Sequence, residues 1–360
     1  MTSTSTSTRL RRVDPNGPGL HRRKAGKGFS YVDEDGHRVD DATRARIEAL
    51  VIPPAWTDVW ISPDARGHIQ ATGVDVKGRR QYRYHDQWRE ERDRAKHERV
   101  VEVAKALPAL RRRVTRHLRA DDGPTRRRVL AAAVRLLERG LFRVGGEEYA
   151  SDNDSYGLAT LQKRHVKVRD GALVFDYPAK SGQRRCIEID DPDLVPLVEQ
   201  LKRRTRGGTD LLAYKDDRGR WRDVRSDDVN DYLRDALGAD ASAKDLRTWG
   251  GTVLAAVALA AEDGGAAAAA PDGLGGDPKV VTRAVKRVAR QLGNTPAVAR
   301  SAYVDPRVIS RYEDDGTTVD LDDVPGVRAD DPPEDAVPTP DPADVLTAAE
   351  SAVVDLLDES

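Results

Sequence analysis

The chain has 360 residues, of which 38% are hydrophobic and 34% are charged, and its formal net charge is −1. This length suits two domains, and a single cysteine excludes an internal disulfide and a cysteine-rich zinc site. The sequence has no apolar run of about 18 residues that could cross a membrane. Its Ser/Thr-rich start lacks the apolar core of a secretory signal, so we expect a cytoplasmic protein.

The near-neutral total hides a strong asymmetry of charge. Residues 313–360 hold 16 Asp or Glu and one Arg, net −15, so the preceding residues carry net +14. A basic body indicates a polyanionic partner such as nucleic acid. An arginine-rich solvated surface gives the same count, so charge alone leaves both interpretations open.

Residues 1–27 are polar and basic and predict a flexible arm. Residues 28–105 predict a small β-rich domain, because short alternating runs such as Phe29–Val32 and Val59–Ile61 are separated by Asp-Gly and Pro-Pro turns. Toward the end of this stretch the pattern becomes charged and helical, and we place the domain boundary after residue 105.

Residues 106–315 predict a larger, mainly helical domain. Apolar residues spaced three and four apart indicate a helix that opens at Thr125 and ends at Gly140. The period then changes, and three short β runs joined by tight turns predict an antiparallel meander over 165–168, 172–177 and 184–189.

The rest of this domain returns to helix over 191–260 and 279–292, and Thr295-Pro296 opens a short helix that carries Tyr303. The Ala/Gly/Pro-rich stretch 261–277 predicts a flexible insertion. Residues 316–360 are acidic and proline-rich and predict a disordered tail, although 343–357 could form a small amphipathic helix. The expected fold class is α+β: a small β-rich N-terminal domain, then a mainly α domain with a three-stranded antiparallel sheet.

Several common catalytic motifs are missing from the sequence. It contains no phosphate-binding loop of the Gly-x4-Gly-Lys-Ser/Thr type, no dinucleotide-binding glycine fingerprint and no Gly-x-Ser-x-Gly elbow. All seven histidines lie at or before His165 without paired spacing, which argues against a histidine metal site. We therefore expect neither a cofactor nor a metal.

A set of cations ahead of one tyrosine remains as the candidate chemistry. It comprises Arg143, Lys180 in a tight turn between two strands, Arg247, and Asn294 nine residues before Tyr303. Each has an ordinary structural interpretation by itself: a surface arginine, a solvated lysine, a helix cap, a core tyrosine.

The combination resembles the poxvirus-type branch of the type IB DNA topoisomerases, in its bacterial form. The resemblance covers about residues 28–312. It rests on the blocks Gly157–Val168 (GLATLQKRHVKV), Lys244–Gly250 (KDLRTWG), Asn294–Tyr303 (NTPAVARSAY) and Asp75–His85 (DVKGRRQYRYH).

The resemblance implies a role for each matched residue. Tyr303 would attack a DNA phosphodiester and hold the 3′-phosphate covalently, and Lys180 would protonate the departing 5′ oxygen with help from Lys244. The non-bridging oxygens would be bound by Arg143, Arg247 and Asn294. Many relatives have His where Asn294 stands, and Asn keeps a donor but no charge. The family's N-terminal DNA-contacting strand matches Lys77, Arg79, Arg80, Tyr82 and Arg83.

The chemistry of these side chains supports the assignment. A phenol has a pKa of about 10, and clustered guanidinium groups favour its phenolate and stabilise charge on phosphate oxygens. A phosphotyrosyl bond keeps the energy of the cut strand, so resealing needs no ATP. The implied activity is relaxation of supercoiled double-stranded DNA by a monomer associated with the nucleoid.

Other interpretations stay open. A tyrosine recombinase uses the same chemistry, although such enzymes typically carry His-x-x-Arg where this chain has Lys244 to Arg247. A non-catalytic DNA-binding protein could keep the fold. The acidic tail could compete with DNA for the basic body, or serve only as a solubilising segment.

Overall fold

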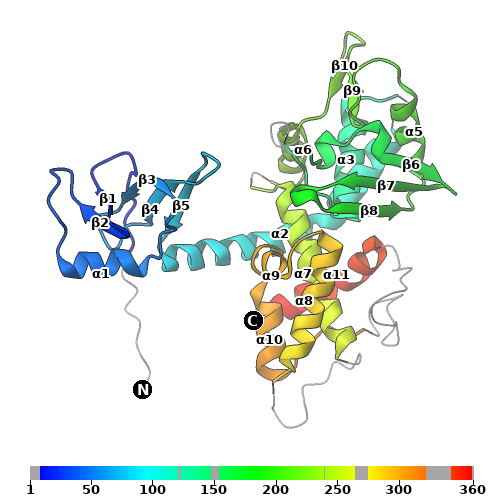
Figure 1. Ribbon diagram of the computed structural model, residues 1–360. Coiled ribbons are helices and arrows are strands. Elements are labelled where there is room, and N and C mark those ends of the chain that lie inside the picture. Colours follow the sequence, from blue (N-terminus) through cyan, green and yellow to red (C-terminus); the bar gives the residue numbers. More distant parts are fainter. Residues whose placement is uncertain are drawn as a thin grey trace. The chain divides into compact units, whose positions relative to one another are not determined.

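The computed structural model describes residues 9–120, 123–146, 154–238, 240–263, 275–321 and 342–358. The chain divides into two compact units, Met1–His97 and Glu98–Ser360 (Figure 1). The division falls inside the long helix α2 (Asp86–Arg119), eight residues before the boundary predicted from the sequence. Of the described helices, none is both long and apolar enough to span a membrane.

The N-terminal unit is built on a five-stranded antiparallel sheet, as the alternating runs predict. The strand order is β2-β1-β3-β4-β5, and helix α1 (Asp41–Ala49) begins where the side chain of Asp40 accepts a hydrogen bond from the Thr43 amide. A small apolar core includes Ile47, Val59 and Ile61. The strands are β1 (Leu20–Ala25), β2 (Gly28–Val32), β3 (Thr57–Ile61), β4 (Ile69–Val74) and β5 (Arg80–Tyr84).

The prediction of a flexible arm over 1–27 is wrong for its last third. Strand β1 lies inside that stretch and pairs with both β2 and β3. One of its basic residues is held by the fold: Arg22 lies over the ring of Phe29, 4.1 Å from the centroid, and donates to the Trp56 carbonyl at 2.5 Å. Residues 1–8 lie outside the described part of the chain.

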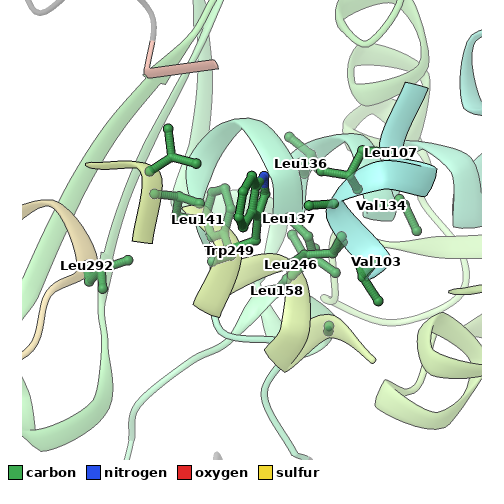
Figure 2. Close-up of a cluster of buried hydrophobic side chains, with 14 of the residues drawn as sticks. Val103, Leu107, Val134, Leu136, Leu137, Leu141, Leu158, Leu246, Trp249 and Leu292 are labelled. Carbon is green, nitrogen blue, oxygen red and sulfur yellow. The ribbon is translucent and has the colours of Figure 1, made fainter. Parts of the chain in front are cut away.

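Helix α7 (Ala243–Glu262) runs through the core of the C-terminal unit and is buried over nearly all of its length. Its Trp249 packs among leucines that include Leu137 and Leu141 at the end of α3 (Arg126–Gly140) and Leu246 of α7 itself (Figure 2). The other helices are α5 (Val195–Arg203), α6 (Ser226–Leu237), α8 (Pro278–Leu292), α9 (Pro296–Tyr303) and α10 (Pro306–Asp315).

The predicted meander is confirmed as an antiparallel sheet of order β6-β7-β8, formed by β6 (Val166–Arg169), β7 (Ala172–Pro178) and β8 (Arg184–Ile189). Short 3-10 turns over Leu158–Thr160 and Lys163–His165 precede it, and another over Lys180–Gly182 joins β7 to β8. A second hairpin, β9 (Ala213–Lys215) and β10 (Trp221–Asp223), interrupts the region predicted as helix over 191–260. Asp216 stabilises its turn by accepting from the backbone amides of Arg218 and Arg220.

The end of the predicted disordered tail is folded, and the helix considered for 343–357 is confirmed. Helix α11 (Pro342–Asp358) packs on α7 and α3, and it buries Ala349, Val353 and Leu357. The start of the predicted insertion 261–277 belongs to α7, and Gly276 donates to the Tyr312 carbonyl at 2.7 Å. Residues 264–274 and 322–341 lie outside the described part of the chain.

Candidate active site

A pocket of about 260 Å³ in the C-terminal unit gathers five of the six predicted catalytic residues: Arg143, Lys180, Lys244, Arg247 and Tyr303. They come from four segments that are far apart in the sequence: the loop after α3, the turn between β7 and β8, the first turns of α7, and the end of α9. Its described lining offers cations, hydroxyls and backbone, with no carboxylate or imidazole. Such a donor set suits an anion.

Arg247 is the most firmly held of these residues and is 2% exposed. Its guanidinium donates to the carbonyls of Leu141 and Leu292 and lies 5.0 Å from the centroid of the Tyr303 ring. Burial, then the charges of Arg143 and Arg185, lower the pKa of Arg247 to about 10. That value is far above neutral pH, so Arg247 stays charged beside the tyrosine.

Arg143 and Asn294 form a second pair at this site. Arg143 donates to the Gly293 carbonyl at 2.8 Å and to Oδ1 of Asn294. Asn294 is therefore tied to the site although it does not line the pocket. Its Nδ2 is buried and has no hydrogen-bond acceptor among the described residues. An unused buried donor beside Arg143 is suited to an oxygen of a bound anion.

Backbone conformation explains how separate segments converge here. Leu141 ends α3 in the left-handed region at φ 47°, which is costly for a residue with a Cβ. Its carbonyl accepts from Arg247 and, at 3.2 Å, from Arg185. Gly293 ends α8 at φ 56°, a conformation that glycine adopts freely, and its carbonyl accepts from Arg143.

The start of α7 is fixed by its cap. Asp245 accepts from the backbone amide of Ser242 at 2.9 Å and from Arg99 at 2.9 Å. Lys244 and Arg247, three residues apart, therefore fall on one side of the first helical turn. Lys244 and Lys180 are exposed whereas Arg247 is buried. The pocket therefore has a buried guanidinium on its inner side and two ammonium groups that face solvent.

Sequence reasoning missed Arg185, which is also part of this cluster. Arg185 lies on β8 and donates to the Gln291 carbonyl at 2.8 Å as well as to Leu141. Burial, followed by the charge of Arg143, lowers its pKa below the ordinary value. The alternation of side chains along β8 could have indicated that Arg185 is partly buried, because it shares its face of the strand with Ile187 and the fully buried Ile189.

The five predicted DNA contacts of the N-terminal unit do not share one face. Alternation along β5 places exposed Tyr82 on the same side as Arg80 and Tyr84, and places Arg83 on the other side. Tyr82 and Tyr84 are stacked, with centroids 5.9 Å apart and planes at 16°. Tyr84 was not predicted.

The cations on the turn before β5 and at its first residue, Arg80, differ in their ion pairs. Arg79 donates to Asp75 at 2.9 and 2.7 Å, and Arg80 lies 3.7 Å from Asp58. These acidic neighbours offset part of the positive charge. Lys77 lies exposed on the same turn.

Comparisons with known proteins point to one family. The family model described as eukaryotic DNA topoisomerase I, catalytic core, matches residues 85–320. The model for the bacterial DNA topoisomerase IB N-terminal domain matches residues 28–75. The chain is 32% identical to DNA topoisomerase 1B of Acanthamoeba polyphaga mimivirus over 302 residues, covering 82% of this chain and 88% of the viral protein. It is also 29% identical to DNA topoisomerase 1 of Daucus carota over 94 residues, covering 26% of this chain and 12% of the plant protein.

Proposed function

The chain belongs to the type IB DNA topoisomerases, and from that premise we propose how its own residues relax supercoiled DNA. Tyr303 is the nucleophile, and Arg143, Arg247 and Asn294 bind the phosphate. Lys180 and Lys244 serve the leaving group. The enzyme nicks one strand, lets the free end rotate and reseals the strand without ATP.

In the cleavage step, Oη of Tyr303 attacks phosphorus and gives up its proton to solvent water, since the described pocket lining offers no carboxylate or imidazole as a base. The bond from phosphorus to the 5′ oxygen breaks, and a phosphotyrosyl diester to the 3′ end takes its place. The departing 5′ oxygen receives a proton from Lys180, with Lys244 assisting. Resealing is the reverse, and one phosphodiester is exchanged for another, so no external energy is needed.

The contact between Arg247 and Tyr303 carries this proposal. A buried guanidinium 5.0 Å from the phenol ring places a permanent charge where the attacked phosphate must lie. Arg143 and the free amide donor of Asn294 add hydrogen bonds to the same region. Donors fixed before the reaction stabilise the charge that grows on phosphate oxygens, which is usually the largest single catalytic contribution.

The N-terminal unit supplies further DNA contacts in this proposal. The stacked Tyr82 and Tyr84 offer flat faces and hydroxyls to the duplex, and Arg80 and Lys77 offer cations to phosphates. Arg83 contributes from the other face of β5. We propose a monomeric state on DNA, because one unit of the chain supplies all the groups that the proposed reaction needs. We also assign the enzyme to chromosomal DNA in the nucleoid.

The test is relaxation of plasmid DNA with EDTA present and ATP absent. Wild-type protein is expected to relax supercoils of both signs and to be trapped on a DNA 3′ end. Tyr303→Phe should bind DNA but yield no relaxation and no covalent adduct. The matched control Tyr214→Phe, on β9 outside the pocket lining, should behave as wild type.

Two outcomes would contradict the proposal. Relaxation by Tyr303→Phe at the wild-type rate would remove Tyr303 from the chemistry. A requirement for two paired DNA sites would favour recombination over relaxation.

A further inference from the structure

Helix α11 packs on the catalytic helix α7 and is also hydrogen-bonded to it through the carboxylate of Glu350. Its two oxygens accept from Arg111 of α2 at 2.7 and 2.8 Å, and one of them also accepts from the indole nitrogen of Trp249 at 3.1 Å. The Glu350 side chain is 13% exposed. Trp249 lies two residues beyond Arg247, so the C-terminal helix bonds directly to the helix that carries the phosphate-binding arginine.

The same network reaches Arg247 from the other side. Arg111 also donates to Glu138 of α3. Helix α3 ends at Leu141, and the Leu141 carbonyl accepts from Arg247 and Arg185. Glu350 and Arg111 therefore link two of the three elements that fix the Arg247 guanidinium: α7, from which it projects, and the end of α3, which supplies the Leu141 carbonyl. The third is the Leu292 carbonyl at the end of α8.

Apolar packing is incomplete beside this network. A cavity of about 170 Å³ lies there and is lined by Arg111, Glu138, Leu141, Leu246, Trp249, Gly250, Thr347 and Glu350, together with other residues of α2 and α3. Trp249 still packs among leucines of α3 and α7, so the directional bonds of Glu350 add to that packing in holding α7 against α3.

The charges facing Glu350 make the network sensitive to its loss. Arg111 lies between two carboxylates, and Arg135 and Arg139 of α3 line the same cavity. Removal of one partner from a buried ion network leaves the others uncompensated, and they move to find solvent or new partners. Replacement by an apolar cluster would provide stability without such directionality, so this network favours a role in fixing geometry.

We propose that Glu350 is a positioning residue for DNA cleavage, acting on the phosphate through Arg247. This inference rests on the proposed roles of Tyr303 and Arg247. It gives the end of the acidic tail a function inside the catalytic unit: α11 holds α7 and the Leu141 turn at the depth that places the guanidinium beside the tyrosine.

The experiment measures single-turnover formation of the covalent adduct at saturating full-length protein, and DNA affinity in parallel. Glu350→Ala should slow adduct formation by about tenfold to a hundredfold, because small misplacements of catalytic groups cost that much, while DNA affinity stays within about twofold. Glu350→Gln should lie between Ala and wild type, since an amide oxygen can still accept from Arg111 or Trp249.

Asp358→Asn is the matched control on the same helix. Asp358 is exposed and pairs with Lys105 of α2 at 2.9 Å, with no bond to α7 among the described contacts. Its adduct formation should equal that of wild type. Thermal unfolding and circular dichroism confirm that each variant is folded, and Glu350→Gln carries the test if Glu350→Ala does not fold.

A double-mutant cycle with Arg247→Ala separates positioning from general stability. If Glu350 acts through Arg247, its replacement should have almost no further effect on the residual rate of the Arg247→Ala protein. Wild-type cleavage rates for the folded Glu350 variants, or a full and independent effect in the Arg247→Ala background, would overturn this inference. Failure of wild-type protein to form an adduct at Tyr303 would instead overturn the proposed function.

Discussion

At the scale of single residues, the arginines of the pocket are held by neutral acceptors. Arg247, Arg185 and Arg143 donate to backbone carbonyls or to an amide oxygen, and no carboxylate bonds to them within the described part of the chain. Carbonyls orient a guanidinium without neutralising it. The full positive charge therefore remains available to an anion in the pocket. Elsewhere in the same unit, Arg119 and Arg307 bond to carboxylates and serve the fold.

Asn294 gives the sharpest prediction at this scale. In Asn294→Asp, one carboxylate oxygen can keep the bond from Arg143, but the donor Nδ2 is lost and a negative charge faces the phosphate. Adduct formation should fall by more than about 10²–10³-fold, which is the usual cost of losing one such donor alone. Single-turnover cleavage at saturating protein measures it. Asn294→Ala, which removes the donor without adding charge, should lose less, and an Asn294→Asp protein that cleaves as fast as wild type would contradict the donor role.

At the scale of elements, two consecutive glycines of α7 lie where neighbouring elements come close. A Cβ on Gly251 would lie 2.5 Å from the Tyr303 carbonyl, and one on Gly250 would lie 2.5 Å from Cδ2 of Leu141. Both distances are shorter than van der Waals contact. At Gly250 the close atom is the end of a leucine side chain, which can rotate away. At Gly251 it is backbone, so the end of α9 approaches α7 next to Arg247 only because this position lacks a side chain.

Gly251→Ala should accordingly separate the nucleophile from its arginine. The new methyl group meets backbone, which cannot rotate away, so α9 must shift; such overpacking costs about 1–3 kcal/mol of stability. Adduct formation should drop on the order of a hundredfold, with DNA affinity nearly unchanged. Gly123→Ala is the control, because a Cβ there meets no atom of the described residues within 4 Å. Equal cleavage by the two variants would show that the contact does not position Tyr303.

At the scale of the whole molecule, turn residues, apolar periodicity and motifs predicted more of the structure than the amino-acid composition of a segment did. The three-strand meander and the convergence of Arg143, Lys180, Arg247 and Tyr303 on one pocket agree with expectations from turns, periodicity and motif resemblance. The flexible arm and the disordered tail were expectations from composition, and both failed in part.

The failures have physical causes. Strand β1 has the basic composition of a flexible arm. Its Arg22, however, donates to the Trp56 carbonyl and lies over the ring of Phe29. Helix α11 belongs to an acidic region, yet its apolar residues recur every three or four positions and its Glu350 is paired inside the protein. The free-energy cost of burying a charged side chain depends on its partner. Partners that lie this far away in the sequence cannot be predicted from the composition of one segment.

The folded α11 changes the hypothesis of competition between tail and DNA. Charges on α11 are tied to the catalytic unit, so competition now depends on residues 322–341, which contain seven Asp or Glu and one Arg. This stretch is tethered to a body of net +14 over residues 1–312. If it competes, replacing its seven acids by Asn and Gln should raise DNA affinity several-fold at low salt and progressively less toward about 0.3 M salt, where exposed charges are screened.

Fluorescence anisotropy with a short duplex across a salt series measures this effect. A variant with the same residues of 322–341 in scrambled order keeps the charge and should bind as wild type, which separates charge from sequence. Plasmid relaxation by the neutralised variant should begin at lower protein concentration, because more enzyme is bound at a given concentration. Superimposable binding curves for the neutralised and wild-type proteins at every salt concentration would leave the stretch as a solubilising segment, with α11 as the only part of the tail that acts on the site.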